Sequence, residues 1–160
     1  MHPTRIDLPL ATREKVCALL NQNLADTIDL SGQAKQAHWN VKGVNFIALH
    51  ELFDKVHEVA EGAVDELAER ITALGGTAEG TVQVVAKRSR LAPYPTNIVR
   101  WRDHVQKMSD ALASVGKNVR AAIDESDKLG DKDTADLFTE ISRDVDKQLW
   151  FVEAHIQVDE

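Results

Sequence analysis

The chain has 160 residues, which is long enough for one domain with its own apolar core and too short for two. Its 19 basic and 26 acidic side chains give a net charge of −7, which argues against a protein that binds nucleic acid by bulk attraction and suits one that handles cations. The N-terminus lacks the apolar run of a signal peptide, and nowhere do about twenty apolar residues follow one another, so we expect a soluble cytoplasmic protein with no membrane partner.

The first part of the chain predicts a tail followed by a helix. Residues 1–11 contain two prolines and no sustained periodicity, and we expect a flexible tail there. Thr12 can cap a first helix over residues 13–40, in which apolar side chains recur at helical spacing. The single cysteine, Cys17, falls on this helix, where we expect it to pack as a small apolar residue.

The longest uninterrupted helical pattern runs from Phe46 to Leu74 and is followed by Gly75-Gly76, as a helix C-terminus requires. At about 100° per residue its apolar side chains fall on one face, which we expect to be buried. The face consists of Leu49, Leu52, Phe53, Val56, Ala60, Ala63, Val64, Leu67, Ile71 and Leu74. The remaining arc carries a line of imidazoles and carboxylates, namely His50, Asp54, His57, Glu58, Glu61, Asp65 and Glu69.

The polar line on this second helix contains a repeated spacing. His50 and Asp54 are four residues apart and share one face, and Asp65 and Glu69 repeat that spacing about three turns further on. His38 precedes a predicted turn that can bring a third ligand near the helix start. Imidazole with carboxylate oxygens suits iron or manganese. The ordinary alternative for such a stripe is a solvated face.

One chain cannot close such a site by itself. Asp54 and Asp65 lie roughly 16 Å apart along the helix axis at about 1.5 Å per residue, too far for one metal centre. If a second copy packs antiparallel across a two-fold axis, the imidazole end of one chain faces Asp65 and Glu69 of the other, and two equal sites form per dimer. The spacing therefore predicts a site shared between subunits.

The second half of the chain predicts three more helices. A short one is expected over residues 81–87, because a structureless connection of this length inside a compact domain is unusual. A third long helix is expected to begin at Pro95-Thr96, and a fourth is expected to be capped by Asp131 or Asp133. Four long helices with one long crossover predict an all-α fold, a ferritin-like four-helix bundle with a short extra helix in the connection between the second and third long helices.

The chain resembles the Dps family, the small ferritins named DNA-binding proteins from starved cells, in KQAHWNVKGVNFIALHELFDKVHEVAEGAVDELAERITALGG and in DTADLFTEISRDVDKQLWFVEAHI. The resemblance implies a hollow shell of twelve chains that oxidises Fe(II), preferably with hydrogen peroxide, stores the ferric mineral and so protects against oxidative damage. It also implies an intersubunit ferroxidase centre whose metal ligands and catalytic residues are His38, His50, Asp54, Asp65 and Glu69.

Two further roles follow from the resemblance. Trp39, beside a ligand, would take up oxidising equivalents near the iron, although a Trp at this spacing more often only packs. Acidic residues around the turn between the last two helices would line a three-fold pore that draws Fe(II) inward, although their ordinary function is helix capping. The pore candidates are Asp127, Asp131 and Asp136.

Several other polar residues are expected to have no part in the chemistry. His57, Glu58 and Glu61 have no counterpart among the implied ligands and should face solvent or the shell interior, and His104 and His155 should lie at the surface or an interface. Arg143 should pair with Asp146 three residues later. A small basic patch of Lys87, Arg88 and Arg90 should be a solvated loop.

Two alternatives come from other functional classes. An oxygenase or a conventional ferritin, with a diiron site inside one bundle, usually shows Glu-x-x-His pairs on two helices, and this sequence contains none. The other alternative is a non-enzymatic DNA-compacting stress protein. Phosphate contacts dominate DNA affinity, but only Arg5 precedes the first helix and the chain ends in Asp159-Glu160, so we expect DNA binding to be weak or absent.

Overall fold

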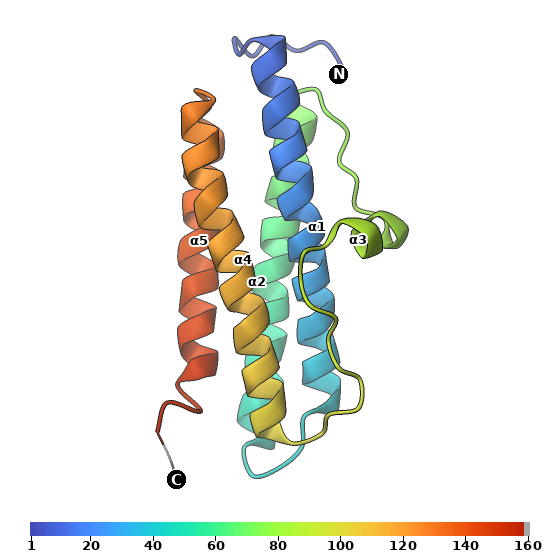
Figure 1. Ribbon diagram of the computed structural model, residues 1–160, viewed down its shortest axis with the longest axis vertical. Coiled ribbons are helices and arrows are strands. Elements are labelled where there is room, and N and C mark those ends of the chain that lie inside the picture. Colours follow the sequence, from blue (N-terminus) through green and yellow to red (C-terminus); the bar gives the residue numbers. More distant parts are fainter. Residues whose placement is uncertain (159–160) are drawn as a thin grey trace.

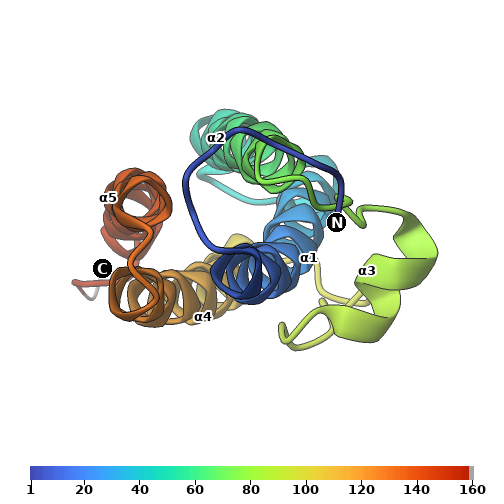
Figure 2. The ribbon, with the colours of Figure 1, turned by 90° about the horizontal axis from the view of Figure 1, so that it is seen from above.

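The computed structural model describes residues 1–158 and places five helices and no strand in them. The helices are α1 (Leu10–Asn40), α2 (Phe46–Ala73), α3 (Val82–Arg88), α4 (Trp101–Lys128) and α5 (Lys132–Glu153). The four long helices lie side by side, and α3 packs outside them against α1 (Figures 1 and 2). The predicted all-α bundle with a short extra helix is therefore confirmed. Within the described residues, no helix is both long and apolar enough to cross a membrane.

The long connection between α2 and α4 runs from one end of the bundle to the other (Figure 1). It therefore lets α4 begin beside the turn that joins α1 to α2. The backbone N–H of Lys42 donates to the Val99 carbonyl at 3.1 Å, and the N–H of Trp101 donates to the Lys42 carbonyl at 3.1 Å. These two bonds hold the α1–α2 hairpin and the start of the α4–α5 hairpin together.

Helix α2 matches its predicted bounds and buries its predicted apolar face, except that Leu52 and Val64 are only half-buried. Gly75 has a φ of 84°, which glycine adopts without steric cost. The N–H of Gly75 donates to the Thr72 carbonyl and that of Gly76 to the Ile71 carbonyl, each at 2.9 Å. This pair of bonds is the Schellman arrangement that ends a helix with a glycine.

The N-terminal segment differs from the expected flexible tail over residues 1–11. Helix α1 already begins at Leu10 and has no side-chain cap, so Thr12 lies within the first turn and does not cap it. The N–H of His2 donates to the Gly75 carbonyl at 2.6 Å. The segment thus lies across the end of the bundle and covers the C-terminus of α2, which its prolines alone could not indicate.

Three other local expectations are settled by contacts between elements. Helix α4 begins at Trp101 rather than at Pro95-Thr96, because the backbone just before it pairs with the α1–α2 turn. Helix α5 is capped by Asp131, one of the two predicted candidates, which accepts from the N–H of Thr134 at 3.1 Å. The predicted pair within α5 is wrong, because Asp146 accepts hydrogen bonds of 2.7 and 2.9 Å from Arg120 of α4.

Helix α1 is buried on two sides, because α3 and the segment after it cover the side that faces away from the core. The buried carboxylate of Asp26 accepts from the backbone N–H and the Nε of Arg90, each at 2.9 Å. Arg88 pairs with Glu79 at 2.5 Å. Both arginines remain exposed, as expected for a solvated patch, but each is paired, and Lys87 and Arg88 lie in α3 rather than in a loop. Cys17 packs in the core as expected, and burial raises the pKa of its thiol.

Candidate metal centre

The two histidines predicted as ligands meet where α1 ends and α2 begins. The His38 and His50 rings stack with 3.7 Å between their centroids and 20° between their planes. His38 Nδ1 lies 2.7 Å from the carbonyl oxygen of His50, and His50 Nδ1 lies 2.9 Å from the carbonyl oxygen of His38. Each ring is thus held by the backbone of the other residue.

These reciprocal bonds decide which nitrogen of each ring is free. A carbonyl oxygen only accepts, so Nδ1 must carry the proton in both His38 and His50. A neutral imidazole held in this way keeps its Nε2 lone pair available. A metal-binding histidine commonly donates its other N–H to a carbonyl or carboxylate in this way, which fixes its tautomer and orientation.

Asp54 lies one turn beyond His50 on α2 and pairs with Lys35 of α1. The Lys35 ammonium, hydrogen-bonded to Asp54, lowers the pKa of that carboxyl, and the positive charge that His38 carries when protonated acts in the same direction. The sequence analysis did not single out Lys35. A signal existed, because Lys35 and Asp54 both lie within about two turns of the α1–α2 turn, on helices that an antiparallel hairpin sets against each other.

The remaining two predicted ligands lie apart from the histidines. Asp65 and Glu69 are exposed on α2, about three turns from Asp54. Nowhere in residues 1–158 do three or more His, Cys, Asp or Glu side chains come close enough to hold a metal ion. A single chain therefore brings His38 and His50 into contact, places Asp54 near them and leaves the two other carboxylates separate.

Two members of the polar line of α2 form hydrogen bonds with α1. Ser31 Oγ donates to Glu61 at 2.5 Å and lies 2.8 Å from His57 Nδ1. Because a hydroxyl carries one proton, His57 Nδ1 must be the donor in the second bond. His57 and Glu61 thus help to fix the α1–α2 register; Glu61 is exposed, as expected, whereas His57 is only half-exposed.

The three pore candidates have different environments. Asp127 and Asp136 are exposed, and Asp127 pairs with Lys132. Asp131 is only 2% exposed and pairs with Arg70 at 2.7 Å, besides capping α5. Because the Asp131 carboxylate is buried and bound to Arg70, Asp131 cannot line a pore. Asp127 and Asp136 remain candidates.

The turn that carries the histidines is surrounded by exposed apolar side chains. Trp39 is 66% exposed, Val44 87% and Ile47 63%. Trp39 does not pack within its own chain, contrary to the ordinary expectation for a Trp at that spacing. Large apolar side chains exposed so close together in the chain are typical of a protein interface.

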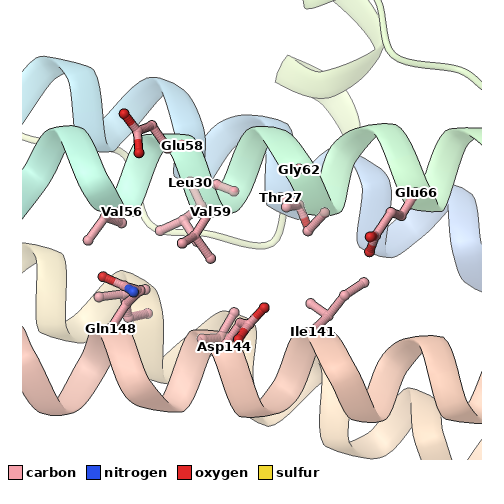
Figure 3. Close-up of a pocket in the computed structure, with 14 residues that line it drawn as sticks. Thr27, Leu30, Val56, Glu58, Val59, Gly62, Glu66, Ile141, Asp144 and Gln148 are labelled. Carbon is pink, nitrogen blue, oxygen red and sulfur yellow. The ribbon is translucent and has the colours of Figure 1, made fainter.

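The alternative location for a metal, inside the bundle, is a cavity of about 170 Å³ between α2 and α5. Figure 3 shows Glu66 of α2 and Asp144 of α5 among its lining residues, with the Gln148 side chain directed toward α2. Burial is the main cause that raises the pKa of Glu66, and the charge of Asp144 adds to it. No histidine is among the 14 lining residues, so this cavity lacks the donor set of a conventional intrabundle centre.

Comparison with known proteins places this geometry in a family. Residues 17–160 match the family described as Ferritin-like domain. The DNA protection during starvation protein of Agrobacterium fabrum is 47% identical over 156 residues, which cover 98% of this chain and 96% of that protein.

Solved structures give the same result. The Dps of Microbacterium arborescens, in a high iron form, is 34% identical, has a TM-score of 0.88 and matches 94% of this chain and 97% of that one. DpsC of Streptomyces coelicolor is 31% identical with a TM-score of 0.93, and the match covers 100% of this chain and 92% of that one. With a matching domain over nearly its whole length and such relatives in both sequence and structure, this chain is a member of the Dps family of ferritin-like proteins.

Proposed function

We propose that this protein is a ferroxidase and an iron store. Two chains related by a two-fold axis share each centre, twelve chains form a hollow shell, and Fe(II) is oxidised there, preferably by hydrogen peroxide. The ferric product is kept inside the shell, which removes both reactants of damaging radical chemistry.

The observation that carries the proposal is the reciprocal bonding of His38 and His50. It fixes two neutral imidazoles with free Nε2 atoms at one end of a polar stripe that otherwise offers carboxylates. Nitrogen and hard oxygen donors together suit iron. Asp65 and Glu69 lie too far along α2 to join them in the same chain, and a two-fold axis supplies the equivalent pair from a second chain.

Within such a site each residue has a definite task. The Nε2 atoms of His38 and His50 bind Fe(II), and the ionised carboxylates of Asp65 and Glu69 from the other chain offset the positive charge that grows as Fe(III) forms. Asp54 can bind iron only if its pairing with Lys35 loosens. Hydrogen peroxide accepts two electrons and two protons and becomes two molecules of water.

The exposed apolar residues around the histidines support the shared centre. Trp39, Val44 and Ile47 flank the site residues at the α1–α2 turn. A second chain docked here would bury these side chains and would exclude bulk water from the centre. The high iron form recorded for the relative from Microbacterium arborescens agrees with an iron-handling role.

The direct test combines mass and activity. Light scattering and native mass spectrometry should report a dodecamer, and absorbance of the ferric product should rise faster with hydrogen peroxide than with dissolved oxygen. A stable monomer at micromolar concentration would contradict both the shared centre and the storage role.

A mixed-variant experiment tests the two-chain site itself. One variant carries His38→Ala and His50→Ala. The other carries Asp65→Asn and Glu69→Gln. Each alone should lose rapid Fe(II) oxidation. After dissociation, mixing in equal amounts and reassembly, half of the dimers are mixed and each mixed dimer rebuilds one of its two sites, so about a quarter of the sites should recover.

The controls for this experiment are the two variants dissociated and reassembled separately, which should stay inactive. Native mass spectrometry must show mixed assemblies in the active sample. Mixed assemblies that remain as inactive as their parents would require a different ligand set.

A further inference from the structure

A half-buried tyrosine and a buried histidine form a second paired site outside the proposed centre. Tyr94 lies in the segment between α3 and α4, and His104 lies in the first turn of α4. The Tyr94 hydroxyl is 2.8 Å from His104 Nδ1, and the ring centroids are 6.0 Å apart. His104 is only 1% exposed, so its expected place at the surface is wrong for the isolated chain.

The protons of this pair can be assigned. Burial lowers the pKa of His104, so the imidazole is neutral, and burial raises the pKa of Tyr94 well above its usual value, so the phenol keeps its proton. The backbone carbonyl of Ile98 also acts on His104 and opposes the lowering of its pKa. A carbonyl only accepts and Nδ1 faces Tyr94, so the imidazole proton belongs on Nε2. Tyr94 therefore donates to Nδ1.

This arrangement favours loss of an electron from Tyr94. Removing an electron from a phenol makes its proton strongly acidic, and a neutral imidazole already in hydrogen-bond contact can take that proton without any movement of the chain. The contact of His104 Nε2 with the Ile98 carbonyl falls outside ordinary hydrogen-bond geometry, so within the described residues Tyr94 is the hydrogen-bond partner of this ring.

The pair lies at the end of the bundle that holds the proposed centre. Trp101 lies three residues before His104 on α4, so the two side chains share one face. The Trp101 ring lies against Gly43, where an added Cβ would be 2.8 Å from its Cδ1 atom. Gly43 belongs to the turn between α1 and α2, and three residues later the Phe46 ring lies 5.2 Å from that of His50. The start of α4, which carries His104, is therefore packed against the turn that separates His38 from His50.

We propose that Tyr94, hydrogen-bonded to His104, is a one-electron donor that completes the reduction of hydrogen peroxide when a centre holds a single Fe(II). This inference rests on the proposed ferroxidase function. Fe(II) supplies one electron and Tyr94 the other, while the phenolic proton moves to His104 Nδ1 and hydrogen peroxide takes up two further protons from hydronium ions of the solvent. The products are Fe(III), two molecules of water, a neutral tyrosyl radical and protonated His104. No hydroxyl radical leaves the shell.

The test uses the fact that Tyr94 is the only tyrosine in the sequence. The assembled wild-type protein is prepared with ordinary and with ring-deuterated tyrosine, loaded with one Fe(II) per centre, mixed with hydrogen peroxide and frozen for electron paramagnetic resonance. Fe(III) is measured in the same samples. We expect an organic radical whose spectrum narrows on deuteration and whose yield falls when Fe(II) is in excess.

Two outcomes would overturn the inference while leaving the ferroxidase intact. They are Fe(III) formation without a radical that responds to deuteration, and a tyrosyl yield independent of iron loading. Absence of Fe(II) oxidation would instead refute the proposed function itself.

Variants then separate the proton acceptor from a purely structural role. In the His104→Gln protein an amide can still bond to Tyr94 but cannot hold the proton, so the radical yield should fall at least several-fold although iron is still oxidised. High-field spectra of the wild-type radical should show the shifted g component of a tyrosyl that accepts a hydrogen bond. An unchanged radical yield in His104→Gln would show that the imidazole is not the acceptor.

Discussion

At the scale of single residues, Asp131 illustrates how one side chain connects two helices. It accepts from the N–H and the hydroxyl of Thr134, at 3.1 and 2.6 Å, and from Arg70 of α2 at 2.7 Å. Arg70 also donates to the Thr134 hydroxyl at 2.9 Å. The three residues form a closed network, because each of them is hydrogen-bonded to the two others.

We therefore expect Asp131→Ala to lower the free energy of unfolding by about 3–5 kcal/mol, because it leaves the mostly buried Arg70 unpaired and removes a helix cap. Asp133→Ala is the matched control. Asp133 lies in the first turn of α5 but is exposed, so its loss should cost less than about 1 kcal/mol. Urea unfolding at fixed protomer concentration measures both. Equal losses in the two variants would show that the network adds nothing.

At the scale of elements, Gly75 serves both the C-terminus of α2 and the N-terminal segment that packs on it. Gly75 has a positive φ, and a Cβ on it would lie 2.4 Å from the carbonyl oxygen of His2. The same residue thus ends the helix and lets the N-terminal segment approach.

Gly75→Ala should destabilise the protein by at least about 1–2 kcal/mol for the left-handed backbone alone, and it should also displace the N-terminal segment. Gly32→Ala, in the middle of α1 with nothing within 4 Å of the added carbon, should instead stabilise by about 0.5–1 kcal/mol. Thermal unfolding at one protomer concentration compares them, and proteolysis of the first residues reports the displacement. A neutral Gly75→Ala would contradict the assigned strain.

Helix bounds followed from the sequence where they depend on local chemistry. The periodicity of α2 and its glycines predicted both of its ends, because capping and amphipathic burial are local. The start of α4 was not predictable in this way, because it is set by pairing of residue 99 with Lys42, far away in the chain. The predicted pair of Arg143 and Asp146 was wrong for a similar reason. Spacing within α5 carries no information about Arg120 of α4, whose guanidinium binds Asp146.

The candidate site was predicted as a set of residue types but not as a geometry. Spacing on one helix indicated His50 and Asp54, whereas the ring-to-backbone bonds with His38 require the register of two helices. The same register explains why Lys35 and Ser31 were missed. The contact between Tyr94 and His104 was not predicted, and His104 was expected at the surface or an interface, because a lone histidine on an amphipathic helix carries no sequence signal of burial.

At the scale of the whole molecule, the distribution of charge decides what the surface can attract. The net charge is −7, and the two arginines of the basic patch are already paired with Asp26 and Glu79. Only Lys87 of that patch is left without such a pair among the described residues. The acidic pair Asp159-Glu160, also used to argue against DNA binding, lies outside the described residues.

We expect no shift of plasmid DNA near pH 7, even in a gel at low salt, because phosphate contacts need free cationic side chains. The sequence pI is about 5.3, so the net charge becomes positive below that pH and binding should appear there. Light scattering at each pH controls for dissociation. A clear shift at pH 7 in ordinary salt would contradict this charge argument.

The reciprocal bonds between His38 and His50 also bear on when the protein becomes reactive. The two residues are 12 positions apart, so their contact closes within one hairpin, and contacts this local form early in folding. A newly made chain would then have its imidazoles ready before it meets a partner, yet would lack the carboxylates that complete the centre. In the proposed two-chain centre, the number of working centres would rise with the square of protein concentration while dimers are scarce. Abundance would act as a threshold: a cell that makes little of this protein would hold inert chains, and oxidising capacity would appear steeply once synthesis increases.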